Sequence, residues 1–180
     1  MLHKTFRSMA YIFEYLQHEY ISDIKEGWFI DIGSGSGKGV IAAALLHPFA
    51  KCVGIEYLEK LHLMAISSKN LYDQYISSLI QKNPELFVGM QLPNTVDFVN
   101  NDFLKESWEN ASIILANSTC FSLELIHKIG KKANRECKSG TTIVTFTKRI
   151  TNLGDEWDLK DGFRRNMSWG IATIYVHRKL

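Results

Sequence analysis

The sequence predicts an α/β fold in which a doubly wound, mostly parallel sheet ends in an antiparallel pair of strands. Three observations support this prediction. Short, continuously apolar runs recur along the chain, as is typical of parallel strands that are buried on both faces. Helix-length stretches separate several of these runs. A glycine-rich loop directly follows the first run, at the edge where α/β sheets bind ligands.

The size and composition of the chain indicate one domain that spans residues 1–180. With 180 residues, of which 46% are hydrophobic, the chain can bury one core but not two ordinary ones. It contains no repeat, low-complexity tract or linker. The 21 Lys and Arg residues and 19 Asp and Glu residues give a net charge of +2, too small for a strong whole-molecule attraction to nucleic acid. We therefore expect any contact with nucleic acid to be indirect.

Other sequence features argue against a membrane or metal protein. The longest purely apolar run, Val40 to Leu46, is far shorter than the roughly 20 residues that span a bilayer, and the N-terminus has no signal-peptide pattern. The three cysteines and six histidines do not follow metal-ligand or disulfide spacings. We expect an intracellular protein in a reducing compartment, with no membrane segment and no bound metal.

The first part of the chain predicts two units of a helix followed by a strand. A helix is expected over Thr5 to Tyr20, and a strand over Trp28 to Ile32. A second helix is expected over Val40 to Leu46, and a second strand over Cys52 to Ile55. The first helix is indicated by apolar residues at helical spacing: Phe6, Met9, Ala10, Phe13, Leu16 and Tyr20.

A longer helix is predicted over residues 58–79, packed on the sheet. Residues 82–95 contain two prolines and a glycine, which indicates a connecting loop. A strand is expected next, over Val96 to Val99. The face of the long helix that is expected to pack on the sheet carries Leu61, Ala65, Tyr72, Tyr75, Ile76 and Leu79.

The last part of the chain predicts four further strands. Ile113 to Ala116 is another continuous apolar run, whereas Thr142 to Thr147 alternates more between apolar and polar residues. Asp158 to Trp169 and the alternating run Ile171 to His177 are expected to form the terminal antiparallel pair.

The clearest functional signal is the glycine-rich loop at the end of the first predicted strand, Asp31-Ile-Gly-Ser-Gly-Ser-Gly37. A phosphate-binding Walker loop would need a glycine in place of Ile32 and a Ser or Thr in place of Gly39. The dinucleotide fingerprint also fails, because its third glycine is missing in either register. The remaining interpretation is the acidic-x-Gly-x-Gly-x-Gly loop of methyltransferases, which predicts S-adenosylmethionine as the cofactor.

This interpretation assigns cofactor-binding roles. Asp31 is expected to bind the ammonium of the methionine moiety, while Gly33, Gly35 and Gly37 let the backbone turn tightly and approach the ligand. Glu56 ends the second predicted strand about 20 residues further on, where a carboxylate can accept both ribose hydroxyls. A helix cap or a solvated loop charge is the alternative role for Glu56.

Asp102 and Phe103 follow the strand at Val96 to Val99 and supply candidates for adenine recognition. Asp102 could accept from the adenine amino group, and Phe103 could stack on the ring. The alternative is structural, because a buried Phe beside a surface Asp is common.

Together with further motifs, these residues make the chain resemble the disruptor-of-telomeric-silencing (Dot-one-like) histone lysine methyltransferases from about Thr5 to Arg178. The resemblance implies a seven-stranded, Rossmann-like methyltransferase sheet and transfer of a methyl group to the ε-amine of a protein lysine. The family substrate is a lysine in the histone H3 core within nucleosomes, which implies a nuclear, chromatin-associated protein. The motifs are Asp31-Ile-Gly-Ser-Gly-Ser-Gly37, Gly54-Ile-Glu56, Asp102-Phe-Leu104 with Trp108, Ser112-Ile-Ile-Leu-Ala-Asn117 with Phe121, and Ser168-Trp169 with Tyr175-Val-His177.

The resemblance also implies a channel for the acceptor lysine. Phe121, Trp169 and Tyr175 are its expected aromatic walls, and Asn117 is expected near the reacting centre. The spacing between Trp169 and Tyr175 is about one residue shorter than is usual in the family. This difference leaves open whether Ile174 or Tyr175 faces the channel.

The chain departs from the family where specificity would be decided, because Thr119 stands in place of an aromatic wall. Three functions therefore stay open. The leading one is a protein lysine methyltransferase. The second is a methyltransferase that acts on a small molecule or on another protein side chain. The third is a catalytically silent module that binds S-adenosylmethionine, because little chain precedes the first helix to supply the family's usual lid.

Two further features have both a functional and a structural interpretation. Lys128, Lys131, Lys132 and Arg135 lie at helical spacing and could contact DNA phosphates, but the solvated outer face of a helix is the preferred interpretation. Cys120 has no predicted His or basic partner beside it. We therefore expect a buried small residue there rather than a nucleophile.

Overall fold

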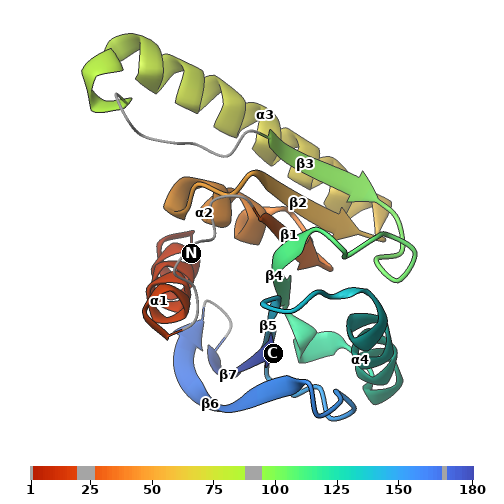
Figure 1. Cartoon of the computed structure of the whole chain (residues 1–180). Coiled ribbons are helices and arrows are strands. Elements are labelled where there is room, and N and C mark those ends of the chain that lie inside the picture. Colours follow the sequence, from red (N-terminus) through yellow and green to blue (C-terminus); the bar gives the residue numbers. More distant parts are fainter. Residues whose placement is uncertain (1, 20–26, 88–94, 168–169) are drawn as a thin grey trace.

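The computed structural model describes residues 2–19, 27–87, 95–167 and 170–180. Its strands form one seven-stranded sheet in the order β3-β2-β1-β4-β5-β7-β6 (Figure 1). β1 to β5 run parallel, whereas β7 pairs antiparallel with both β5 and β6. The predicted sheet with a terminal antiparallel pair is therefore confirmed. The strands are β1 (Trp28–Ile32), β2 (Lys51–Glu56), β3 (Thr95–Asn100), β4 (Ala111–Ala116), β5 (Thr142–Phe146), β6 (Trp157–Met167) and β7 (Gly170–Lys179).

Helices cover both faces of this sheet, as a doubly wound fold requires. α1, α2 and the first part of α3 pack on one face, and α4 packs on the other (Figure 1). No helix within the described ranges is long and apolar enough to cross a bilayer. The helices are α1 (Leu2–Glu19), α2 (Lys38–Leu46), α3 (Glu59–Lys82) and α4 (Leu123–Glu136), with short 3₁₀ turns at Pro84–Phe87 and Ser118–Cys120.

The core consists of two apolar clusters, one on each face of the sheet. Successive side chains of a strand point to opposite faces, so Phe29 of β1 packs in the cluster that holds α1 and α2, whereas Ile30 packs in the cluster that holds α4. In α1, the predicted face is confirmed for Met9, Phe13 and Leu16, which are buried. The predicted roles of the side chains of Phe6 and Tyr20 lie outside the described residues.

α3 is longer than predicted, and its C-terminal part extends beyond the edge of the sheet (Figure 1). Ala65 and Ile76 are buried, in agreement with the predicted packing face. Tyr75, by contrast, is 61% exposed, so the prediction that it packs on the sheet is wrong. The physical reason is that Tyr75 lies on the flank of the apolar face, about 100° from Ile76. A sheet that ends below the helix does not reach that flank.

The connection from β3 to β4 carries no helix, although these parallel strands are separated by β2 and β1 in the sheet. Residues 101–110 instead form turns that lie on the α4 face. Phe103 and Trp108 are buried in the cluster on that face, and Trp108 is fully enclosed. These two aromatic rings cover part of the sheet that a crossover helix would otherwise cover.

β5 differs from its sequence pattern. All five residues of β5 are buried, although its sequence alternates more between apolar and polar residues. The reason is the position of the strand, since β5 lies between β4 and β7 with helices on both faces. Thr142 and Thr145 are the polar residues that this position encloses.

Candidate functional site

The glycine loop lies where the winding of the sheet changes direction. The chain winds from β1 to β2 and β3 on one side, and then returns to β4 and β5 on the other, so the switch point lies between β1 and β4. Gly33, Gly35 and Gly37 follow β1 and have φ angles of 75°, 56° and 79°. A Cβ atom at Gly37 would also lie 2.5 Å from Cζ of Phe98. The loop therefore has a backbone that glycine adopts readily and other residues rarely do.

A cavity of about 270 Å³ lies at this switch point. Its volume is close to the lower end of the range for small-molecule sites, so it can enclose part of a cofactor of drug size. The cavity brings together the glycine loop, the end of β4 and side chains from α1, β5 and β6. The lining residues are Met9, Asp31, Gly33, Ser34, Gly35, Ser36, Lys38, Gly39, Leu115, Asn117, Phe146 and Met167.

Asp31 contributes a buried carboxyl group to the cavity. The residue is 4% exposed, and its Oδ1 has no hydrogen-bond partner among the described residues. Burial, and next the negative charge of Glu56, raise the pKa of this carboxyl from 3.8 to about 7. A Cβ atom at Gly39 would lie 2.5 Å from Oδ2 of Asp31, so the first turn of α2 lies directly against the carboxyl group. A cationic donor such as an ammonium would satisfy this oxygen.

Glu56, at the end of β2, is anchored by the backbone of two neighbouring segments. Its Oε2 accepts from the backbone N–H of Gly35 at 2.8 Å, and its Oε1 accepts from that of Leu58, also at 2.8 Å. The carboxylate therefore holds the glycine loop against the start of α3. Glu56 does not line the described cavity. Ribose binding by Glu56 stays a prediction. Its contact with the N–H of Leu58, at the start of α3, agrees with the alternative role as a helix cap.

The structure places Asp102 and Phe103 outside the described cavity. Oδ1 of Asp102 accepts from the backbone N–H of Leu104 at 2.9 Å, which closes a local turn. Phe103 is 8% exposed, and its ring lies 5.8 Å from that of Phe121 and 6.4 Å from that of Trp108. These contacts agree with the alternative that Phe103 is a core residue. Adenine binding by Asp102 and Phe103 stays a prediction.

Asn117 and Phe121 come from the loop that follows β4, and both lie beside the glycine loop. Asn117 lines the cavity together with Asp31. Phe121 is half-buried, and a Cβ atom at Gly33 would lie only 3.0 Å from its Cζ. The structure thus brings two of the predicted catalytic residues to the same edge of the sheet as Asp31.

Of the other two predicted channel residues, the structure describes only Tyr175, which does not line the cavity. Trp169 lies outside the described residues. Tyr175 pairs with Thr145, whereas Ile174 pairs with the cavity residue Phe146 and is buried in the same cluster. Because neighbouring residues of a strand point to opposite faces, Ile174 lies on the face of the cavity and Tyr175 on the other.

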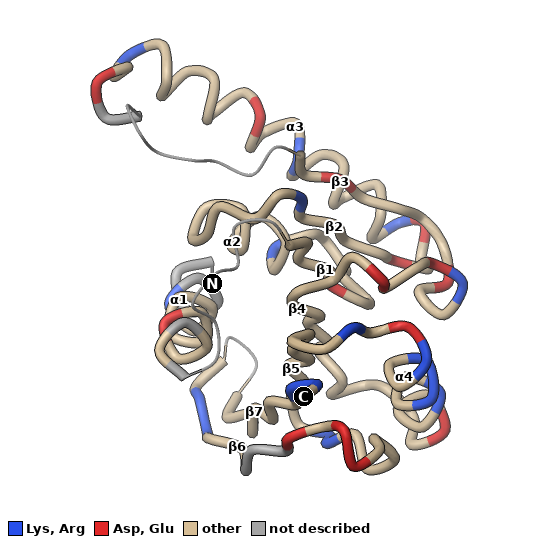
Figure 2. Tube along the Cα trace, in the orientation of Figure 1, with Lys and Arg blue, Asp and Glu red and all other residues tan. Residues whose placement is uncertain are grey.

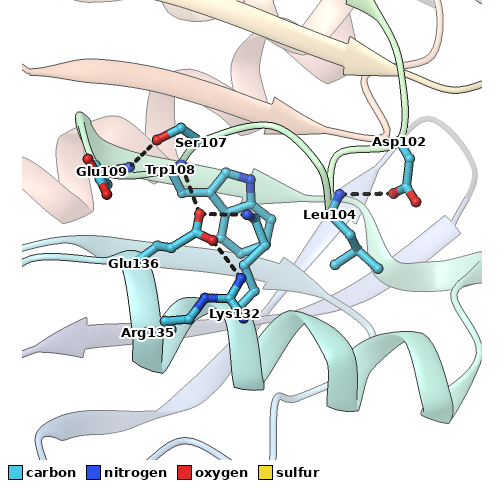
Figure 3. A network of polar contacts seen from close by, with 8 residues as sticks. All are labelled: Asp102, Leu104, Ser107, Trp108, Glu109, Lys132, Arg135 and Glu136. Atoms are coloured by element: carbon cyan, nitrogen blue, oxygen red, sulfur yellow. Dashed lines mark hydrogen bonds and ion pairs between the residues drawn. The ribbon is translucent and has the colours of Figure 1, made fainter.

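Figure 2 shows that basic and acidic residues both lie along α4. Three of the basic residues, Lys128, Lys132 and Arg135, form ion pairs within the helix, as Figure 3 shows for the last two. Lys132 is 4% exposed; its Nζ lies 2.5 Å from Glu136 and 5.0 Å from the ring centre of Trp108. Glu136 also accepts from Arg135 at 2.7 Å. Lys128 pairs with Glu124 at 2.6 Å, while Lys131 is exposed. The interpretation as a solvated face therefore fails for Lys132, because the loop with Trp108 covers it.

Cys120 also differs from its prediction. Its side chain is exposed, so the expected buried position is wrong. The short turn Ser118–Cys120 buries its first residue and turns its last one outward. No group of three or more His, Cys, Asp and Glu side chains that could hold a metal lies within the ranges that the structure describes.

Sequence reasoning missed several residues of the cavity. Met9, Phe146 and Met167 reach it from α1, β5 and β6, which are distant in sequence and carry no local motif. A signal was present for Lys38, because it directly follows the glycine loop. Only the folded sheet brings the three distant side chains to the switch point.

Solved structures confirm the fold. An RNA methyltransferase from Salinibacter ruber, in complex with S-adenosyl-L-homocysteine, superposes with a TM-score of 0.59 at 19% identity, covering 92% of this chain and 88% of that one. Magnesium protoporphyrin IX methyltransferase from Synechocystis PCC 6803 superposes with a TM-score of 0.63 at 10% identity, covering 97% and 79%. At such identities the likeness concerns the fold alone, which is the Rossmann-like sheet that the sequence predicts.

Sequence comparisons show the family. A curated relative from Caenorhabditis elegans, the histone-lysine N-methyltransferase that is H3 lysine-79 specific, is 31% identical over 124 residues. The match covers 69% of this chain but 13% of that protein, so this chain spans a small part of its relative's length. The model of the family described as histone methylation protein DOT1 matches residues 8–162. The chain therefore belongs to the DOT1 histone methylation protein family.

Proposed function

We propose that this chain is a methyltransferase domain that binds S-adenosylmethionine and transfers its methyl group to the ε-amine of a protein lysine, with histone H3 in nucleosomes as the substrate. The observation that carries the proposal is the buried Oδ1 of Asp31, which has no hydrogen-bond partner in the described part of the chain and lies beside three glycines with positive φ. Family membership supports the lysine acceptor. In this proposal, residues 1–180 form one domain that acts in the nucleus.

The residues of the site fit the proposed cofactor. Burial and the charge of Glu56 raise the pKa of Asp31, and its Oδ1 has no hydrogen-bond partner among the described residues. The ammonium of the methionine moiety would supply that partner. At Gly35 no atom lies within 4 Å of the place that a Cβ would take, so this glycine leaves space for a ligand against the backbone. Glu56 would hold the ribose hydroxyls next to the glycine loop, and Asp102 and Phe103 would bind adenine beyond the described cavity.

The proposed reaction depends mainly on positioning. Bound S-adenosylmethionine supplies a methyl group on a sulfonium sulfur as the electrophile. The acceptor amine must be neutral to attack, although a free lysine has a pKa of about 10.4. Apolar walls that exclude water favour the neutral amine, and Phe121 is the described residue placed for this role. Trp169 is proposed as a second wall, with Ile174 in place of Tyr175 because Ile174 lies on the face of the cavity.

A methyltransferase for a small molecule or for another protein side chain is the second candidate. It is favoured by Thr119, whose hydroxyl lies near Asn117 where the family carries an aromatic wall. Substitution Thr119→Phe separates the two candidates, because a larger wall should obstruct a bulkier acceptor more than a narrow alkyl amine. The assay compares both proteins on nucleosomes and on a metabolite extract with methyl-labelled cofactor.

The direct test of the proposed function is methyl transfer to nucleosomes, free histones and a cell lysate. We expect label on histone H3 that is lost in Asp31→Asn, with the exposed variant Asp155→Asn as the matched control. Label on small molecules alone would replace the proposal with the second candidate. Cofactor binding by calorimetry without any transfer would identify a silent binding module instead.

A further inference from the structure

The loop that follows β4 is fastened to the end of β5 by hydrogen bonds. The hydroxyl of Ser118 donates to the backbone oxygen of Phe146 at 2.6 Å and lies 3.2 Å from that of Lys148. Nζ of Lys148 donates to the backbone oxygen of Phe121. These contacts join two segments almost 30 residues apart in sequence, and they hold the loop after β4 at two points, Ser118 and Phe121.

Two threonine hydroxyls continue this connection to the cavity residue Asn117. The hydroxyl of Thr119 donates to Oδ1 of Asn117 at 3.0 Å, and the same hydroxyl oxygen lies 3.1 Å from the hydroxyl of Thr147. A hydroxyl has one hydrogen to donate. Since Thr119 gives its hydrogen to Asn117, Thr147 must donate to Thr119. The order of donors is therefore Thr147, then Thr119, then the amide oxygen of Asn117.

The backbone of Thr147 supports a functional role for this chain of hydroxyls. Thr147 has a φ angle of 70° and is the only non-glycine residue with positive φ within the described ranges. For a β-branched residue this conformation is strained, and such strain persists where surrounding contacts hold it and clusters at functional sites. Its backbone N–H donates to the oxygen of Thr173 at 2.7 Å, which holds the strained turn against β7.

The amide of Asn117 is oriented by this arrangement. Its Oδ1 is engaged by Thr119, and among the described residues its Nδ2 donates no hydrogen bond. Asn117 lines the cavity next to Asp31, so the N–H groups are the polar atoms that the amide has left to offer there. An N–H group binds an oxygen acceptor, and it would compete for the lone pair of an attacking amine. The fitting partner is thus a carboxylate or carbonyl oxygen of the bound molecules.

We propose that Thr119 and Thr147 are positioning residues that fix the amide of Asn117 with its N–H groups directed to an oxygen atom in the cavity. This inference rests on the proposed function for its consequence in catalysis, but the orientation itself can be measured without activity. Thr119 then has a role of its own, because its hydroxyl orients the amide of Asn117.

The first test observes the amide of Asn117 directly. The protein is labelled with ¹⁵N-asparagine, and the side-chain NH₂ signals of Asn117 are assigned by their loss in Asn117→Asp. We expect Thr119→Val, which replaces the hydroxyl by a methyl group, to shift or broaden these signals, whereas Thr119→Ser retains them. Thr147→Val keeps the β-branched shape and should move them in the same direction by a smaller amount. Signals unchanged in both valine variants would overturn the proposal.

The second test uses methyl-labelled cofactor and the acceptor that the wild-type protein methylates. We expect kcat to fall about five- to tenfold in Thr119→Val, the equivalent of one hydrogen bond, with the acceptor KM within about twofold and with recovery in Thr119→Ser. Thermal melting of each variant controls for folding, and Thr147→Val, at an exposed position, serves if Thr119→Val unfolds. Equal losses in the valine and serine variants would contradict a positioning role. Absence of transfer in the wild type, with the amide signals shifted as expected, would refute the proposed function and leave the orientation intact.

Discussion

Asp31→Asn should stabilise the protein without cofactor at high pH while weakening cofactor binding. The substitution keeps the shape of the side chain and removes its charge. Asp31 is fully buried, its Oδ1 has no partner among the described residues, and burial followed by repulsion from Glu56 raises its pKa to about 7. A buried carboxylate without a counter-charge opposes folding, so the effect must appear where the group is ionised.

The magnitude follows from the two pKa values. Each pH unit between folded and unfolded values corresponds to about 1.4 kcal/mol, so the difference between 3.8 and about 7 corresponds to about 4 kcal/mol. Below pH 3.8 the group is protonated in both states and the destabilisation is absent. It grows as the pH rises towards 7 and is complete above it, because the folded state keeps a proton that the unfolded chain has released.

The assay is unfolding of wild type and Asp31→Asn between pH 4 and pH 8, monitored by circular dichroism. We expect the stability difference between the two proteins to change by about 4 kcal/mol in favour of the variant across this range, or roughly 10 °C in melting temperature. Asp155→Asn, at an exposed loop position, is the control and should show no such trend. In calorimetry, Asp31→Asn should bind S-adenosylmethionine roughly ten- to a hundredfold more weakly. Parallel stability curves together with unchanged affinity would refute the reasoning.

Three further predictions concern residues around the site and in the core. Glu56→Ala should weaken cofactor binding by roughly ten- to a hundredfold in calorimetry. The loss should be smaller in Glu56→Gln, because glutamine keeps one acceptor oxygen. Equal affinity in the wild type and both variants would remove Glu56 from the site. Phe103→Ala should destabilise the fold by about 3 to 5 kcal/mol in urea unfolding, because the ring packs against two other rings; a marginal change would contradict a core role. His177 is fully buried, and burial, with the nearby charge of Arg149, lowers its pKa to about 4, so the protein should lose stability as the pH falls from 6.5 to 4. His177→Leu should reduce that loss in acid unfolding curves, and a variant as acid-sensitive as the wild type would show that other groups cause it.

Part of the candidate site was predictable because its signals are local. Asp31 and the three glycines lie within seven consecutive residues. The glycines have positive φ angles, which glycine adopts readily wherever it stands in a sequence. Asn117 and Phe121 were found through the resemblance to the family, and the structure places both beside the glycine loop. The sequence alone could not decide whether Phe103 contacts a ligand or packs in the core, because the short motif Asp102-Phe103 is compatible with both.

The remaining cavity residues could not be predicted, since they depend on how distant segments pair. Met9 and Met167 meet at the cavity from opposite ends of the chain. The choice between Ile174 and Tyr175 depends on the register of β7 against β5, because a shift of one residue exchanges the faces. No spacing in the sequence fixes that register.

The sequence by itself determined the strands, the helices, the glycine loop and the family, because each of these is encoded by residues that are close together in the sequence. Only the tertiary structure decided that β7 lies between β5 and β6, that Tyr75 is exposed and that Lys132 is buried. It also decided that the hydroxyl of Thr147 reaches Thr119 beside Asn117. These features arise from contacts between segments far apart along the chain, whose energies depend on burial and on pairing that no local pattern encodes.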